Sequence, residues 1–390
     1  MQESPYTPSS IARDLVGREQ QLRRAQMMLT SVSSNKLAEE LQIYVGPRGV
    51  GKTSLLRSIQ SAAQSQSFET VWVTAGDGVV IDELVSGIEK LLNNHARQVS
   101  TALWDMIKNI KVSIAGVSVS GPGSSELKTA NMGPSSHSLG RQLQDILVAV
   151  GKDLQGTEKS AGLGIFVDEI QLADGPSIRA LAYTWQHLQS EGSELPLFCL
   201  MSGLSHSQDV ITEYASFGER FNYINLSNLD EASSAEALRR PAEKMGVKWT
   251  PSALLDAANT AAGYPYFLQL IGECSWEAAG LPEPGGVISP EVLVQAKSIF
   301  HNRLQQFYRS RWMKASESEQ EIMAAMAQYG DEPVRRGSIA QELGKPSSAL
   351  SMQRQSLMDK GLVESTGWGM MSFTAPGFGD FIRKLIGADE

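Results

Sequence analysis

The feature that most constrains this chain is the octapeptide at residues 46–53, which reads Gly-Pro-Arg-Gly-Val-Gly-Lys-Thr. It matches the pattern G-x-x-x-x-G-K-[ST] in full. A short apolar run precedes it at residues 41–45, and an amphipathic segment follows from Ser54 to about Gln64. In this context the glycines let the backbone wrap around phosphates, and the loop N–H groups point inward at a helix N-terminus. The octapeptide therefore predicts an α/β fold with a phosphate-binding loop between a strand and a helix.

The predicted ligands of this loop are ATP or ADP, together with Mg²⁺. We expect the nucleotide to contact the whole loop and the residue after it, namely Gly46, Pro47, Arg48, Gly49, Val50, Gly51, Lys52, Thr53 and Ser54. Lys52 is expected to be a solvent-facing ligand of the β- and γ-phosphates, and the Thr53 hydroxyl to ligate Mg²⁺. The alternative, a glycine-rich turn without a ligand, is disfavoured by the full match and its flanking segments.

A pair of carboxylates follows the apolar strand predicted at residues 164–167. In open α/β sheets ligands bind at the carboxyl ends of the strands, so Asp168 and Glu169 should face the phosphate loop. We expect Asp168 to hold Mg²⁺, directly or through water, and Glu169 to act as general base on the attacking water. The alternative is an ordinary exposed strand end, because Asp-Glu pairs are common.

Two further residues fit a site that responds to the nucleotide. Ser202 ends the predicted strand at residues 197–202, where a hydroxyl can sense the γ-phosphate or orient water; a capping role before Gly203 is the alternative. Arg220 stands just before the predicted strand at residues 223–226. It is a candidate arginine finger for a neighbouring subunit, which implies a homo-oligomer, and the alternative is a surface ion pair with Glu219 or another acid.

The order of segments divides the chain into an N-terminal tail (1–14), a core (15–229), a helical lid (230–312) and a C-terminal domain (313–390). In the core, strands and helices alternate as in a parallel sheet with crossover helices. An insertion at about 105–138 interrupts this order: residues 111–120 alternate like a hairpin arm, and residues 121–136 are rich in Gly, Ser and Pro, which predicts a surface insertion. After Leu229 the β-branched runs stop, and helical patterns dominate.

The C-terminal domain resembles a winged helix-turn-helix. Helices are predicted at residues 319–329 and 338–343, a recognition helix at 347–360, and a hairpin wing around 367–369. The polar side chains of the recognition helix that could reach bases or phosphates are Ser348, Ser351, Gln353, Arg354 and Gln355.

The net charge of the C-terminal domain does not decide whether its partner is DNA or a protein. Residues 315–390 hold seven Lys and Arg against eleven Asp and Glu, a net charge of −4, whereas DNA-binding domains are usually basic. The whole chain carries −9, which excludes coating of nucleic acid by bulk charge, so any such contact must be local. Duplex DNA and a protein surface both remain candidate partners.

Taken together, these residues carry a resemblance to AAA+-type ATPases. The segments that resemble the family are Val16-Gly17-Arg18-Glu19, the Asp168-Glu169 pair, Ser-Gly-Leu at 202–204 and Gly263-Tyr264-Pro265. Within this family the chain resembles the archaeal and STAND-like ATPases, which are relatives of the replication initiators. The resemblance implies that Val16, Gly17 and Arg18 lie against the adenine, and that Tyr264 and Pro265 of the lid approach the nucleotide. Residues 264–274 lack the arginine that initiators carry there, which favours a STAND-like variant and slow turnover.

We therefore predict an ATP-binding, slowly hydrolysing switch whose nucleotide state controls DNA or protein binding by the winged helix. A DNA-binding regulator with negligible ATP turnover is the alternative. A metabolic kinase shares the phosphate loop but is disfavoured, because no acceptor-substrate pocket is evident.

Several other classes of protein do not fit the sequence. Two cysteines, Cys199 and Cys274, exclude a disulfide framework, and the five histidines show no metal-ligand spacing. The start of the sequence lacks a signal-peptide pattern, and no apolar run is long enough to span a bilayer, so we expect no membrane partner and a cytoplasmic protein.

Overall fold

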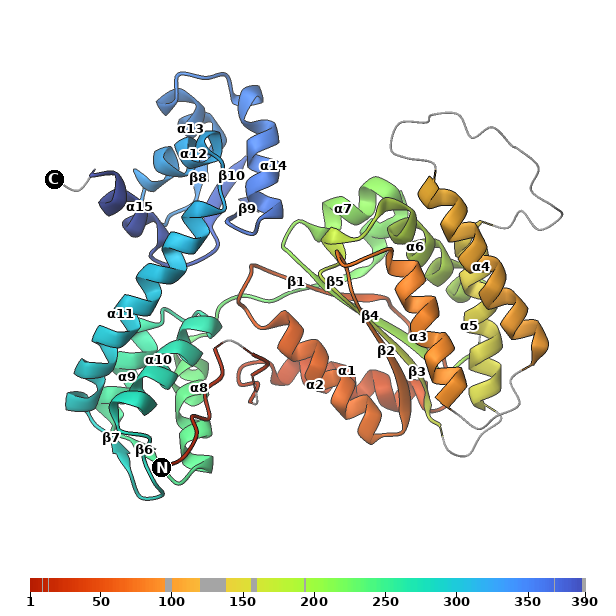
Figure 1. Ribbon diagram of the computed structural model, residues 1–390, viewed down its shortest axis with the longest axis horizontal. Helices are drawn as coiled ribbons and strands as arrows, with labels where there is room; N and C mark the ends of the chain where they lie inside the picture. The colour runs from red at the N-terminus through yellow and green to blue at the C-terminus, as the bar shows by residue number, and fades with distance from the viewer. Residues whose placement is uncertain are drawn as a thin grey trace.

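The computed structural model describes residues 1–8, 10–12, 14–94, 100–119, 138–155, 160–192, 194–367 and 369–387. Figure 1 shows an α/β core on one side of the molecule and, on the other, a helical lid with the C-terminal domain above it. The long helix α11 (Pro290–Met313) runs from the lid to the C-terminal domain.

The centre of the core is a parallel sheet with strand order β2-β3-β4-β1-β5. Its strands are β1 (Gln42–Val45), β2 (Phe68–Thr74), β3 (Gly162–Asp168), β4 (Leu197–Gly203) and β5 (Asn222–Asn225). All residues of β3 and β4 are buried, as expected for central strands covered by helices on both faces. Tyr44 pairs with Ser202, and Val167 pairs with Met201, so the carboxyl ends of β1, β3 and β4 meet at one edge.

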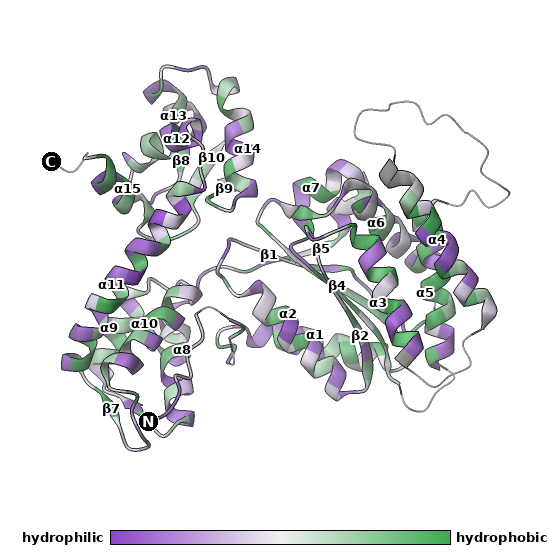
Figure 2. Ribbon diagram, in the orientation of Figure 1, coloured by the Kyte–Doolittle hydropathy of each residue, from purple (hydrophilic) through white to green (hydrophobic). Residues whose placement is uncertain are grey.

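Helices cover both faces of this sheet. Figure 1 shows α1 and α2 on one face and α3, α4, α5 and α6 on the other. The helices of the core are α1 (Glu19–Val32), α2 (Lys52–Ser65), α3 (Val80–Asn94), α4 (Thr101–Val119), α5 (Leu139–Gln155), α6 (Gly175–Ser190) and α7 (Ser207–Tyr214). Figure 2 shows hydrophobic residues concentrated in the strands and on the inner sides of the helices.

The hairpin arm predicted at residues 111–120 is wrong, because residues 111–119 belong to the helix α4. Its buried residues recur three or four positions apart, at Leu103, Ile107, Ile110 and Ile114, and α4 packs against α3 and α5. This stripe of period 3.6 extends over the whole segment, whereas the alternation of period 2 covers only its end. The predicted insertion at 121–136 lies outside the described residues.

The lid consists of α8 (Glu231–Lys244), α9 (Pro251–Thr260), α10 (Pro265–Ala278) and most of α11, with a short parallel pair, β6 (Lys248–Trp249) and β7 (Val287–Ile288). The first residues of the chain pack into it. Tyr6 is buried, donates its hydroxyl hydrogen to the Leu238 carbonyl and accepts one from the Trp249 indole. The N-terminal segment therefore covers the lid.

The C-terminal elements are α12 (Glu317–Ala327), β8 (Val334–Arg335), α13 (Arg336–Glu342), η3 (Ser347–Leu350), α14 (Ser351–Asp359), β9 (Val363–Gly367), β10 (Met370–Phe373) and α15 (Phe378–Ile386). Their antiparallel sheet has the order β8-β10-β9, so the helices and the β9–β10 hairpin have the arrangement of a winged helix. The predicted recognition helix is divided into the short turn η3 and the helix α14. Trp368 lies outside the described residues. Within those residues no helix is long and apolar enough to cross a membrane.

Candidate functional site

The phosphate loop follows β1 and leads directly into α2. Gly51 stands before α2 with φ +92°, and Gly49 has φ +91°, both in the left-handed region that favours glycine. At Gly49 a Cβ atom would lie 2.2 Å from the Tyr264 hydroxyl oxygen. Gly49 is therefore required by both its backbone conformation and the close approach of the lid.

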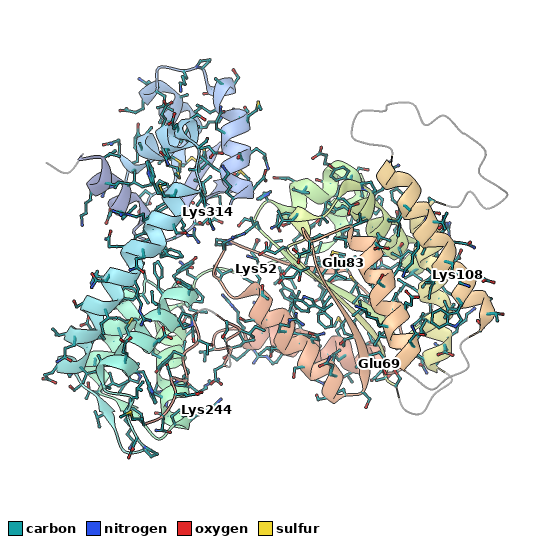
Figure 3. All side chains as sticks on the ribbon, viewed as in Figure 1. Lys52, Glu69, Glu83, Lys108, Lys244 and Lys314 are labelled. Atoms are coloured by element: carbon teal, nitrogen blue, oxygen red, sulfur yellow. The ribbon has the colours of Figure 1, made fainter. Side chains whose placement is uncertain are left out.

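Lys52 is buried, with 6% of its surface exposed, so the expectation of a solvent-facing lysine is wrong. Its Nζ donates hydrogen bonds of 2.9 Å to the carbonyl oxygens of Gly46 and Pro47, which fold the loop over the side chain. Burial lowers the pKa of Lys52 to about 8, and the charges of Glu169 and Asp168 oppose this shift. Figure 3 labels Lys52 at the edge of the core that faces the lid and the winged helix.

Asp168 joins three elements of the core at the carboxyl end of β3. Its Oδ2 accepts a 2.8 Å hydrogen bond from the Thr53 hydroxyl, and its Oδ1 accepts bonds from the Ser202 hydroxyl and from the Glu169 N–H, the latter at 3.0 Å. Asp168 is buried, so the carboxylate faces the loop and not open solvent. The structure thus brings together four of the residues predicted from the sequence.

The oxygens of Thr53 and Asp168 fit Mg²⁺, because this ion prefers hard oxygen ligands and uses few protein groups beside phosphates and water. No group of three or more His, Cys, Asp or Glu residues suited to a metal occurs in the part of the chain that the structure describes. A magnesium ion here would therefore depend on the nucleotide phosphates for the rest of its ligands.

Ser202 is fully buried, and its hydroxyl contacts Asp168. It lies within β4, whereas the residue before α7 is His206. Ser202 is therefore not a capping serine, and its proposed role toward the γ-phosphate or the attacking water remains a prediction.

Glu169 turns the chain out of β3 with φ +56°, a conformation that costs a non-glycine residue about 1–3 kcal/mol. Its Oε2 accepts a 2.5 Å hydrogen bond from the Gln171 amide, whose Oε1 accepts a 3.0 Å bond from the Leu204 N–H. Gln171 thereby holds Glu169 against the loop after β4. Sequence reasoning missed Gln171, because one glutamine in a turn carries no motif.

A small cavity of about 50 Å³ lies where the core meets the lid. Its lining includes Val16, Arg18, Ser54 and Pro265, all predicted from the sequence to lie near the nucleotide. Arg18 is buried and donates from Nη2 to the carbonyl oxygens of Val50 (3.1 Å) and Ser227 (2.6 Å).

Gly17 lies at the edge of the same region. It has φ +73°, and a Cβ atom there would lie 2.8 Å from the Leu229 side chain. The residues implied by the resemblance therefore converge on this junction from the two sides.

Tyr264 connects the lid to the phosphate loop. Its hydroxyl donates to the Arg48 carbonyl oxygen and accepts a 3.4 Å hydrogen bond from Nη2 of Arg311 on α11. Nη1 of Arg311 donates to the Gly361 carbonyl oxygen (3.2 Å) and the Thr374 hydroxyl (2.9 Å) of the winged helix. A chain of hydrogen bonds thus runs from the loop through the lid to the C-terminal domain.

Arg311 is 6% exposed, and burial lowers its pKa. Its guanidinium carbon lies 4.6 Å from the centre of the Phe307 ring. Sequence reasoning missed Arg311, because α11 is distant in sequence from every motif.

Arg220 is exposed at the end of the turn η2 (Ser216–Arg220), before β5. Because the strands are parallel, this is the end of the sheet opposite the phosphate loop. Among the described residues no acid forms an ion pair with it, so the proposed partner Glu219 does not hold it. Arg220 therefore lies away from the phosphate loop of its own chain.

A family described as the AAA ATPase domain matches residues 14–200, and one described as a domain of unknown function matches residues 305–382. No curated protein matches the sequence. The structure is similar to the Walker-type ATPase PABY2304 of Pyrococcus abyssi, with a TM-score of 0.59 and 16% identity over 97% of this chain and 98% of that chain. It is also similar to the ORC2 protein of Aeropyrum pernix, solved as ADPNP–ADP complexes, with a TM-score of 0.56 and 14% identity over 98% and 97%. At these identities the structural likeness shows a shared fold.

Proposed function

We propose that the chain, whose residues 14–200 match the AAA ATPase domain, is a slow ATP-hydrolysing switch in which ATP and Mg²⁺ control what the winged helix binds. The observation that carries the proposal is the hydrogen-bond chain from Arg48 through Tyr264 and Arg311 to Gly361. A change in the loop that moves the Arg48 carbonyl would alter the contact that holds the winged helix.

For the hydrolytic step, each residue near the loop has a role that its position supports. Lys52 and the loop N–H groups bind the phosphates, and Thr53 and Asp168 hold the metal. The bound Mg²⁺ would neutralise phosphate charge. Glu169 accepts the proton of the attacking water on a carboxylate oxygen, while Gln171 holds the side chain in place.

Binding of a partner by the winged helix is proposed to depend on release of α14 from the core. Asp359 at the end of α14 lies 3.1 Å from Nε2 of the buried His206, and Gln353 and Arg354 are half-buried. Burial lowers the pKa of Arg354, and the charge of Asp209 on α7 opposes this shift. Two of the five side chains proposed to contact DNA or a protein are therefore partly covered, whereas Ser348, Ser351 and Gln355 are exposed.

The test measures binding of a fluorescent DNA duplex by the protein in the presence of ADP or of a slowly hydrolysed ATP analogue, at two salt concentrations. If DNA is the partner of the winged helix, the protein should bind the duplex with only one of the two nucleotides. Binding should be weaker at the higher salt concentration, because phosphate contacts release counterions. Size-exclusion chromatography of the same samples reports any homo-oligomer. If the partner is another protein, the duplex should not bind, but the sensitivity of α14 to protease should still depend on the nucleotide. If neither readout depends on the nucleotide, the switch is refuted.

A further inference from the structure

The winged helix contacts the nucleotide-binding edge of the core at three places. Asp359 faces His206, as described above. Gly361 packs against the phosphate loop, since a Cβ atom there would lie 3.4 Å from Nε of Arg48. Glu364 on β9 accepts a 2.7 Å hydrogen bond at Oε2 from the Ser205 hydroxyl, three residues after Ser202.

The contact between Ser205 and Glu364 lies in the wall of an open pocket of about 530 Å³. Gly46, Pro47 and Ser205 of the core line one side, and Glu364 and Thr374 of the winged helix line the other. The carbonyl oxygens of Gly46 and Pro47 are the acceptors of Lys52, so the winged helix places a carboxylate beside the part of the loop that holds the lysine.

Glu364 is half-buried in this position. Burial raises its pKa, while the Ser205 hydroxyl and the charge of Lys52 lower it. Glu364 thus supplies negative charge to Lys52 from a different domain, in the region where a phosphate would supply it.

We propose that Glu364 determines nucleotide specificity, because in the docked arrangement its carboxylate disfavours a nucleoside triphosphate relative to a diphosphate. The loop lysine serves the β- and γ-phosphates, so the γ-phosphate adds negative charge on the side of the loop that Glu364 faces. Like charges at short range disfavour each other, most strongly where water is partly excluded. The inference rests on the proposed function, because it assumes that the loop binds ATP and ADP.

A reciprocal effect follows from this specificity. If docking of the winged helix weakens triphosphate binding, triphosphate binding must weaken docking by the same factor. ATP would then release α14, and ADP would leave it against the core. Glu364 thereby gives the switch its direction.

The test compares the affinities of ADP and the slowly hydrolysed ATP analogue, both with Mg²⁺, for three proteins. These are the wild type, Glu364→Gln, and the matched control Glu342→Gln, which removes an exposed carboxylate from α13 of the same domain. We expect Glu364→Gln to raise the affinity for the analogue relative to ADP by about tenfold, within the usual range of couplings between sites. The control should leave the ratio unchanged.

Equal ratios in Glu364→Gln and the wild type would overturn the proposal. A similar change of this affinity ratio in Glu342→Gln would also overturn it, because the loss of one negative charge anywhere in the domain would then explain the effect. Unchanged ADP affinity shows that each variant folds, and Ser205→Ala, which keeps the carboxylate, should change the ratio less than Glu364→Gln. Failure of the wild type to bind either nucleotide would instead refute the proposed function.

Discussion

Replacement of Arg311 by methionine should loosen the winged helix without unfolding the core. The guanidinium donates charged hydrogen bonds to Gly361 and Thr374 and lies over the Phe307 ring. Methionine has a similar length and keeps much of the apolar packing, but it can make none of these hydrogen bonds.

The size of the effect can be worked from these contacts. Hydrogen bonds to charged groups contribute about 1.5–3 kcal/mol each, and a desolvated cation–π contact contributes about 2 kcal/mol. The variant also no longer has the desolvation cost of a buried charge, which is several kcal/mol and offsets part of this loss. About 3 kcal/mol remains, and at about 1.4 kcal/mol per tenfold this is roughly a hundredfold increase in the open population.

Hydrogen exchange measures this population directly. Amides of β9 and β10 should exchange roughly a hundredfold faster in Arg311→Met, while amides of β3 and β4 keep their wild-type rates. Arg309→Met is the matched control, because Arg309 is exposed on the same helix. Unchanged exchange in β9 and β10 would refute the conclusion that Arg311 holds the winged helix.

Three further predictions concern the loop and its neighbours. Lys52→Ala should abolish ATP binding with an unchanged circular-dichroism spectrum; wild-type affinity in a labelled-ATP titration would exclude it as a phosphate ligand. Glu169→Gln should retain ATP and Mg²⁺ but slow phosphate release by about 10²–10⁴-fold, whereas Asp168→Ala should weaken Mg²⁺-dependent binding; equal loss of binding in both contradicts the assigned roles. If Arg220 acts in trans, turnover per subunit should rise over a hundredfold range of protein concentration, and Arg220→Ala should remove that rise with ATP affinity retained. A flat wild-type curve would exclude a finger.

The part of the site that the sequence predicts consists of contiguous motifs and strand ends. Residues 46–53 carry their own conformational requirements, and in a parallel sheet the ends of β1, β3 and β4 must meet at one edge. The contact between Thr53 and Asp168 therefore follows from local pattern and topology alone.

Contacts between domains could not be predicted in this way. Arg311 joins Tyr264 to Gly361, and Glu364 meets Ser205 across more than 150 positions of sequence. No periodicity marks these side chains, because they are brought together by the packing of the core, the lid and the winged helix against one another. The buried position of Lys52 was missed for a related reason, since the loop closes on its own lysine through two carbonyl groups.

The central claim, that the nucleotide moves the winged helix, is tested most directly by a distance between the two domains. Met27 on α1 and Met352 on α14 are exposed, whereas both native cysteines are buried, so cysteines at these two positions can be labelled selectively. Energy transfer between the labels would be measured with ADP and with the slowly hydrolysed ATP analogue. We predict a longer distance with the analogue than with ADP, and no such difference in a Lys52→Ala background. The same distance with both nucleotides, each shown to be bound, would contradict the account.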